Sequence, residues 1–406
     1  MFANCAKCDF YLTENHDFSD GDCICGATEV CKHNWGAWVI DTQPTLSETG
    51  SKHRVCSLCN EEEEATIPIA KLDTAITIAP TVNVTQTINL RFLMSGLPKE
   101  NPNDTKSDVM NFYVEVKNDR CKTDYNFIEG GYTYTVAKND TDVMFAASNN
   151  RYYFLYNHMR LYELNIPITA TVYCLNSDGE VVYISEPVVT TVADKVVAQY
   201  NSSGSANAKT LYSDIIELAK EAQVYAVNGK DVALKNYGYE DFDFTGTPTG
   251  TVDKSKLNTT NRKIPENSDI YITPSFNVAG SPAIRFMVEG ATKNYNVDNL
   301  KLVISYESTE YTIPDTIYNV SEISSTSGTS GNRYYTLYSG VALCDGNQTV
   351  TAKLYNGSIQ AENLVATTEY SFENAIANTT TSSRAYNLYM TVAKVGISAR
   401  TYFGVS

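Results

Sequence analysis

The chain has 406 residues, of which 43% are hydrophobic and 19% charged, a composition typical of globular proteins with about two to four domains. Its formal net charge of −16 argues against binding to nucleic acid or to an anionic membrane, because both need basic residues that neutralise phosphates. No segment approaches the roughly 20 apolar residues that cross a bilayer, so we expect no membrane insertion.

Seven of the ten cysteines precede residue 60. With one histidine they form two groups of four potential ligands: Cys5, Cys8, Cys23 and Cys25, then Cys31, His33, Cys56 and Cys59. Two ligands on one tight turn can share a tetrahedral ion, and a second pair completes its coordination. The spacings therefore predict two structural zinc ions in a small N-terminal domain, residues 1–70.

Two alternatives stay open for these ligands. His16 could replace a thiol in the first group, because His16-Asp-Phe18 echoes His33-Asn-Trp35. The cysteines could also form disulfides instead of binding metal. The three later cysteines, Cys121, Cys174 and Cys344, are isolated, and we expect buried or incidental thiols there.

The acidic run Glu61–Glu64 predicts a solvated strand end or a linker. Beyond it the sequence repeats itself in ordered blocks. Residues 76–84 match 270–278 and residues 91–94 match 285–288, both at a spacing of 194. Residues 150–156 match 332–338 and residues 168–173 match 350–355, both at a spacing of 182. Several ungapped blocks in one order indicate a duplicated domain.

The elements of each copy follow from local patterns. Apolar residues alternate over 168–174, which predicts a strand with one buried face. Asp178-Gly179 predicts a hairpin turn between 170–175 and 181–184. Helical spacing predicts a closing helix in each copy, preceded by the polar stretches 201–207 and 379–383. The residues at this spacing are Leu211, Ile215, Leu218 and Ala222, then Leu388, Val392, Val395 and Ala399.

These patterns predict a mainly β protein with α-helices. A zinc-ribbon-like domain at 1–70 precedes two duplicated β-sandwich-like domains at 71–229 and 267–406, each closed by a C-terminal helix. The segment 230–266 is rich in Gly, Thr, Asn and Asp, and we interpret it as a linker.

The second ligand group lies within a longer pattern: Cys31-Lys-His33-Asn-Trp35-Gly-Ala-Trp38, Pro44-Thr45, Glu48-Thr-Gly50, Arg54-Val-Cys56-Ser-Leu-Cys59 and Ile67-Pro68. This pattern resembles a cysteine/histidine zinc-ribbon-like repeat of multidomain surface proteins of Gram-positive gut bacteria, and residues 16–26 look like a variant of it. The family repeat has a cysteine after Pro-Thr, where this chain has Leu46. The ending Tyr402-Phe403-Gly404 resembles a Tyr-rich β-module of the same proteins. The resemblance implies display on a surface.

We predict that the protein is not an enzyme. Three of its four histidines lie before residue 60, and the fourth, His158, stands beside Tyr156 in a pattern typical of a structural residue. No nucleophile elbow, phosphate loop or dinucleotide fingerprint is present. A pair of glycosidase carboxylates remains open, because such a pair needs only to be close in space.

The Asn-Arg-Tyr-Tyr blocks at 150–153 and 332–335 allow two interpretations. Tyrosines that alternate on a strand could form a platform for sugar rings, with Arg151 or Arg333 beside them. Alternatively, Tyr153 and Tyr335 belong to the core and the arginines pair with carboxylates.

These observations favour a structural or adhesion protein on an exterior surface. The N-terminal residues lack the basic start and apolar run of a signal peptide. We therefore expect a phage virion-associated decoration or fibre protein, anchored by the zinc domain to a protein partner in that assembly. The alternatives are an exported cell-surface protein of a Gram-positive bacterium and a carbohydrate-binding module that takes a cell-surface glycan.

Overall fold

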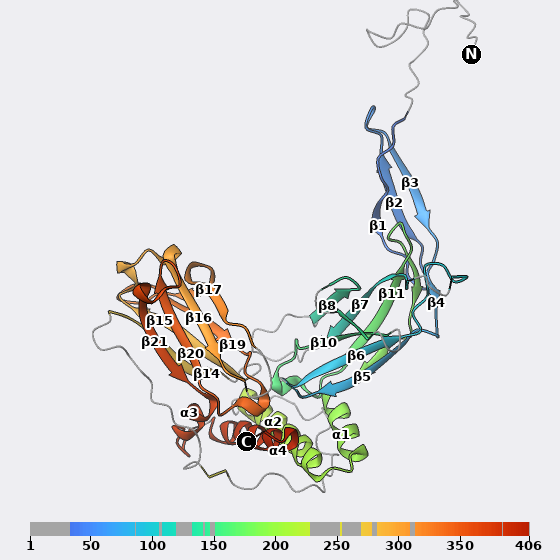
Figure 1. The fold of residues 1–406 in the computed structure, drawn as a ribbon. Helices are drawn as coiled ribbons and strands as arrows, with labels where there is room; N and C mark the ends of the chain where they lie inside the picture. Colours follow the sequence, from blue (N-terminus) through green and yellow to red (C-terminus); the bar gives the residue numbers. More distant parts are fainter. Residues whose placement is uncertain are drawn as a thin grey trace, which may run out of the picture. The chain divides into compact units, whose positions relative to one another are not determined.

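A computed structural model describes residues 33–85, 87–104, 108–118, 132–140, 143–146, 151–227, 252–253, 269–277, 282–308, 313–383 and 385–405 (Figure 1). It contains several antiparallel sheets and a few helices, which confirms the prediction of a mainly β chain with α-helices. The chain divides into two compact units. One holds the chain up to Thr74 with Pro98–Phe112 and Tyr173–Ser185, and the other holds Ala75–Leu97, Tyr113–Val172 and Glu186–Ser406.

The first unit contains a three-stranded antiparallel arm. Its strands, in the order β1-β2-β3, are Val39–Thr42, Gly50–Val55 and Glu62–Ile67. The acidic run is therefore mostly a strand, and of the two sequence interpretations the strand end is the one found. Arg54 of β2 lies opposite Glu63 of β3, so opposite charges meet across the ladder.

A hairpin whose turn lies in the same unit confirms the predicted turn at Asp178-Gly179. Strands β11 (Ile168–Leu175) and β12 (Val181–Ile184) pair antiparallel, and Gly179 between them has a φ of 81°, a backbone conformation that glycine adopts without strain. The short strand β4 (Lys71–Leu72), which follows the arm, pairs in parallel with β12. The arm is thus joined to the hairpin through backbone hydrogen bonds.

The first β-rich copy is built on two sheets. One has the order β5-β6-β10-β9, and the other has the order β4-β12-β11-β7-β8, with β13 also paired to β11. The strands not yet given are β5 (Thr77–Asn83), β6 (Asn89–Ser95), β7 (Asn111–Asn118), β8 (Tyr132–Ala137), β9 (Val143–Ala146), β10 (Arg151–Tyr156) and β13 (Val188–Thr190).

The second copy has two four-stranded sheets, ordered β14-β15-β19-β18 and β17-β16-β20-β21. Their strands are β14 (Ile270–Asn277), β15 (Ala283–Gly290), β16 (Leu300–Tyr306), β17 (Thr316–Asn319), β18 (Ser324–Thr326), β19 (Arg333–Tyr338), β20 (Val350–Asn356) and β21 (Leu364–Tyr370). Both sheets contribute to one hydrophobic core, in which Phe286 of the first sheet and Leu302 and Leu354 of the second are fully buried.

The repeated blocks lie on strands with the same pairing register in both copies. Residue 78 pairs with residue 94 on β5 and β6, and their matches 272 and 288 pair on β14 and β15. Residue 152 of β10 pairs with residue 94, and its match 334 of β19 pairs with residue 288. Arg91 and Arg285 therefore occupy the same place in their sheets, and so do Tyr152 and Tyr334.

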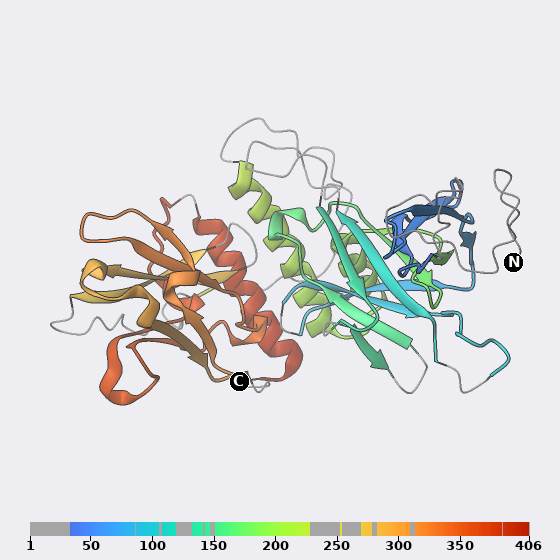
Figure 2. The ribbon, with the colours of Figure 1, turned by 90° about the horizontal axis from the view of Figure 1, so that it is seen from above.

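Each copy ends in two helices rather than one. The helices are α1 (Val192–Ser202), α2 (Ala206–Val227), α3 (Phe372–Ala377) and α4 (Tyr386–Phe403). The predicted helices correspond to α2 and α4, whose residues at helical spacing are buried. Helices α1 and α3, which begin at the side-chain caps Thr191 and Ser371, were not predicted. Helix α4 packs on α2, as both ribbon views show (Figure 1, Figure 2).

The predicted linker, 230–266, lies outside the described residues apart from Val252 and Asp253.

Candidate metal centre

Three of the predicted ligands meet at one end of the arm. His33 lies before β1, and Cys56 and Cys59 lie in the turn between β2 and β3. One donor atom from each of these side chains lies within 4.8 Å of the other two. Nδ1 of His33 lies 3.5 Å from Sγ of Cys59. Three of the four residues of the second predicted ligand group are therefore brought together from two distant parts of the sequence.

The turn between β2 and β3 places the thiols of Cys56 and Cys59 close to each other. The backbone N–H of Cys56 donates to the carbonyl of Glu61, and the N–H of Asn60 donates back to the carbonyl of Cys56, each over 2.9 Å. Asn60 has a φ of 59°, in the left-handed region that asparagine enters more readily than most residues. This residue reverses the chain directly after Cys59, so that the second thiol stays close to the first.

The surroundings of Cys56 favour its thiolate form. Burial raises the pKa of this thiol, but hydrogen bonds from the backbone N–H groups of Leu58, Cys59 and Asn34 and from the His33 ring outweigh burial and lower the pKa to about 6. The N–H groups of Asn34 and Leu58 lie 3.3 and 3.4 Å from the sulfur. Because the thiolate is the form that binds metal, this thiol is prepared for coordination at neutral pH.

The donor set fits zinc. Two thiolates and an imidazole are typical ligands of structural zinc, and bonds of about 2.3 Å to sulfur and 2.0–2.1 Å to nitrogen put tetrahedral neighbours roughly 3.6 Å apart. The separation of 3.5 Å between His33 and Cys59 agrees with this value. The other ring nitrogen, Nε2 of His33, lies 3.5 Å from a carboxylate oxygen of Glu61, the kind of outer partner that orients a metal-binding imidazole.

The remaining predicted ligands lie outside the described residues. These are Cys31 of the second group, all of the first group (Cys5, Cys8, Cys23 and Cys25), and the alternative ligand His16. Sequence reasoning missed Glu61. Its position two residues after Cys59 could have indicated a role beside the metal. The acidic run that it begins was interpreted only as a solvated strand end or a linker.

A continuous stack of side chains runs from the metal centre along the arm. The ring of His33 stacks on Trp35 with centres 4.6 Å apart, and the guanidinium of Arg54 lies 5.0 Å from the centre of the Trp35 ring. On the other side, Arg54 lies 4.7 Å from the centre of the Trp38 ring, and Nζ of Lys52 lies 4.9 Å from that centre. We call these five residues the cation–π ladder. The three contacts of Arg54 and Lys52 are attractive, because in each a cation faces the electron-rich face of an aromatic ring.

The ladder ends on the β11–β12 hairpin. Nζ of Lys52 lies 2.6 Å from a carboxylate oxygen of Glu180, and both side chains are largely buried. Hydrogen bonds from Lys52 and then from Asn176 hold the pKa of Glu180 below its usual range. Gln43 adds two bonds: its amide donates to the carbonyl of Gly179 and accepts from the N–H of Val181. Side chains thus connect the metal centre to the hairpin without a break.

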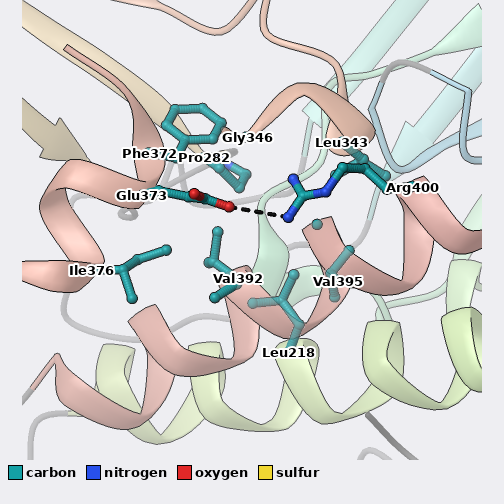
Figure 3. A pocket seen from close by; sticks show the side chains of 12 residues that line it. Leu218, Pro282, Leu343, Gly346, Phe372, Glu373, Ile376, Val392, Val395 and Arg400 are labelled. Atoms are coloured by element: carbon teal, nitrogen blue, oxygen red, sulfur yellow. Dashed lines mark hydrogen bonds and ion pairs between the residues drawn. The ribbon is translucent and has the colours of Figure 1, made fainter. Parts of the chain in front are cut away.

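A small apolar pocket lies in the other unit, between α4, α3 and the middle of α2 (Figure 3). It measures about 20 Å³, room for roughly one water molecule. Its polar feature is an ion pair between Glu373 and Arg400, whose atoms are 3.0 Å apart. The lining residues are Leu218, Pro282, Leu343, Gly346, Phe372, Glu373, Ile376, Val392, Ala393, Val395, Gly396 and Arg400. This volume suits a packing defect rather than a substrate site.

The structure agrees only in part with the core interpretation of the Asn-Arg-Tyr-Tyr blocks. The core interpretation is wrong for Tyr153 and Tyr335, which are half-buried, whereas Tyr152, one position earlier, is buried. Arg333 pairs with a carboxylate as expected, with its Nε 3.5 Å from Glu289. Tyr153 instead lies under a different arginine, Arg91, whose guanidinium is 5.3 Å from the ring centre.

The other sequence candidates fit structural roles. His158 lies among aromatic rings, with its centre 4.4 Å from that of Tyr134 and 5.6 Å from that of Tyr156. Cys174 and Cys344 are buried, and neither takes part in a disulfide. Burial, with the charge of Asp73, raises the pKa of Cys174 to about 12, so this thiol stays protonated. Cys121 lies outside the described residues.

Comparison of the chain with models of known protein families and with curated proteins gives no match. Among the helices in the described ranges, none combines the length and the apolar character needed to cross a membrane.

Proposed function

We propose that this protein is a non-catalytic structural or adhesion protein of an exterior surface, in which a zinc-stabilised arm holds the β-rich copies to their support. The best assignment is a phage virion-associated protein, a capsid decoration or fibre protein that binds a protein partner in the virion. In this proposal residues 1–70 are a zinc-ribbon-like anchor, and the two copies are duplicated β-sandwich-like domains that are displayed.

The observation that carries the proposal is the route from the metal centre to the hairpin. His33, Cys56 and Cys59 with Cys31 would surround a zinc ion completely, and a fully ligated ion crosslinks chain segments rather than activating water. The His33 ring then stacks into the cation–π ladder, and Lys52 at its far end pairs with Glu180. Such a chain of contacts stiffens the arm, which is what an attachment element needs.

The repeated sheets support display rather than turnover. Strands with the same register recur in both copies, and two copies of a weak binding surface raise overall avidity. The net charge of −16 keeps densely packed molecules from associating with each other.

A second candidate is an exported cell-surface protein or carbohydrate-binding module of a Gram-positive bacterium. The half-buried Tyr153 under Arg91 favours it, because an aromatic ring held by a cation on the outer face of a sheet can stack on a sugar ring. In that case the β-rich copies, and not the arm, make the contact with the surface.

Binding of the whole chain separates these candidates. Labelled full-length protein is offered to phage particles that lack it and to purified cell walls, with Cys59→Ser as the arm variant and Tyr153→Ala as the sheet variant. The proposal predicts binding to particles that Cys59→Ser abolishes and Tyr153→Ala leaves intact. Binding to cell walls that only Tyr153→Ala weakens would favour the second candidate. Polysaccharide hydrolysis that a single carboxylate substitution removes would contradict both.

A further inference from the structure

Helices α2 and α4 occupy the same place in the repeat. At a spacing of 177 the buried residues of one helix match those of the other in type. The matching pairs are Leu211 with Leu388, Ile215 with Val392, Leu218 with Val395, and Ala222 with Ala399. These two helices also pack on each other, so equivalent surfaces of the two copies meet (Figure 2).

The two helices run antiparallel. Asn207, at the start of α2, donates its side-chain amide to the carbonyl of Thr401, near the end of α4. Further along α2, a carboxylate oxygen of Glu217 lies 2.6 Å from Nζ of Lys394. Residue numbers thus rise along one helix while they fall along the other, which is the arrangement that a two-fold axis between identical helices would produce.

One contact away from the centre occurs as a matched pair, as such an axis requires. The rings of Tyr212 and Tyr402 lie with their centres 6.5 Å apart. Replacing each tyrosine by its counterpart in the other copy gives Tyr389 and Tyr225, and these two also interact: after burial, Tyr225 is the second cause that raises the pKa of Tyr389. The same tyrosine pair therefore appears on both sides of the helix contact.

Glu217 and Lys394 are counterparts of each other, because their spacing is also 177. A contact between counterparts lies on the two-fold axis itself. At that one place, two identical copies would bring the same residue of each copy together. A charged residue there would therefore face a like charge. This chain has opposite charges at the position, and they form an ion pair that is partly buried.

We propose that the α2–α4 contact is a two-fold association surface whose partner is specified at the axis: copy 1 accepts copy 2, and Glu217 and Lys394 disfavour pairing of like copies between chains. The surface thus fits one partner, the other copy in the same chain. A copy 1 pair would bring Glu217 against Glu217, and a copy 2 pair would bring Lys394 against Lys394. This inference goes beyond the proposed function and does not depend on zinc.

Full-length charge variants test the axis. Glu217→Lys and Lys394→Glu each place like charges together, and each should lower the melting temperature by roughly 2–4 °C. The double variant E217K/K394E restores opposite charges and should melt within about 1 °C of the wild type. Glu217→Gln has neither the attraction of the wild type nor the repulsion of the single charge reversals. Its melting temperature should therefore lie between theirs. If all four variants melted at the wild-type temperature, or if the double variant showed no recovery, the proposal would be overturned.

A mixing experiment tests partner choice. The two single variants are combined at about 200 µM, a concentration that competes with the roughly millimolar effective concentration within one chain, then warmed and cooled together. Opposite charges meet at the axis only between the two variants, so light scattering should show a 1:1 complex of twice the chain mass. The double variant treated alike should keep the wild-type mass. A mixture that scatters like the two variants measured separately would contradict charge-specified pairing.

Discussion

The imidazole of His33 stacks on the indole of Trp35 with ring centres 4.6 Å apart, while its Nδ1 lies 3.5 Å from the sulfur of Cys59. One ring therefore belongs both to the metal centre and to the cation–π ladder. The chain has two tryptophans, Trp35 and Trp38, and both lie in this ladder. Tryptophan emission consequently reports on the arm alone.

Metal removal should change this emission. Chelation frees the His33 ring to leave Trp35, so the emission intensity and maximum should shift on adding chelator and return on adding zinc. Cys59→Ser should show no zinc-dependent shift. Cys344→Ala, which alters a buried cysteine of the other unit, is the matched control and should respond like the wild type. A shift that persists in Cys59→Ser would mean that the metal binds elsewhere.

Arg54 should be the most sensitive residue of the ladder, because it lies between Trp35 and Trp38 and also pairs with Glu63. Two cation–π contacts and one exposed ion pair together contribute about 1–2 kcal/mol. Arg54→Ala should lower the free energy of unfolding of the arm by that amount, measured by tryptophan emission in urea. Arg54→Lys keeps the charge but not the flat guanidinium, and it should lose about half as much free energy of unfolding as Arg54→Ala. Lys71→Ala, on an exposed strand, should have no effect. If Arg54→Ala left the free energy of unfolding unchanged, the cation–π ladder would contribute nothing to the stability of the arm.

The arm should release the hairpin at low pH. The pKa of Glu180 is lowered in the folded protein by Lys52, so its contribution to stability is complete above the ordinary glutamate range, about 4.3, and is lost as the pH falls through the lowered folded value. Glu180→Gln should therefore be less stable than the wild type at pH 7, and the difference should shrink below about pH 4. Protonation of the metal ligands affects both proteins equally. A difference that does not depend on pH would exclude the charge of Glu180 as the cause.

Gly96 and Gly290 are equivalent, because they are separated by 194 residues like the neighbouring repeated blocks, and both should be intolerant of a side chain. Gly96 and Gly290 have φ values of 71° and 102°, and a Cβ at either one would meet a backbone carbonyl oxygen, 1.9 Å and 2.4 Å away respectively. Each Gly→Ala substitution should destabilise the protein by about 1–3 kcal/mol in thermal unfolding. Gly204→Ala is the matched control, because open space surrounds that position, and it should be neutral. If one of the pair tolerated alanine, the ends of β6 and β15 would not be equivalent.

Local patterns predicted much of the fold. The repeated blocks lie on strands of equal register, the Asp178-Gly179 turn forms, and α2 and α4 coincide with the predicted helices. Helix α1 was missed because Asn201 and Ser202 were interpreted as the start of a following helix, whereas they form the last turn of a preceding one. Polar residues suit both ends of a helix, so composition alone could not place the boundary.

The face of a strand was harder to predict than its existence. Alternation in the block at 150–156 shows that Tyr152 and Tyr153 point to opposite sides, but it does not say which side is the core. The structure buries Tyr152. In the candidate metal centre, His33, Cys56 and Cys59 were predicted from spacing. Glu61 and the ladder depend on which strands pair and in which register.

Native mass spectrometry of the full-length protein tests the central claim most directly, because it counts the metal ions on each folded chain. The two ligand groups predict two zinc ions on the wild type and one fewer on Cys59→Ser, with no change for Cys344→Ala. A metal-free wild-type chain whose mass shows the N-terminal cysteines joined as disulfides would contradict the account of a zinc-stabilised arm.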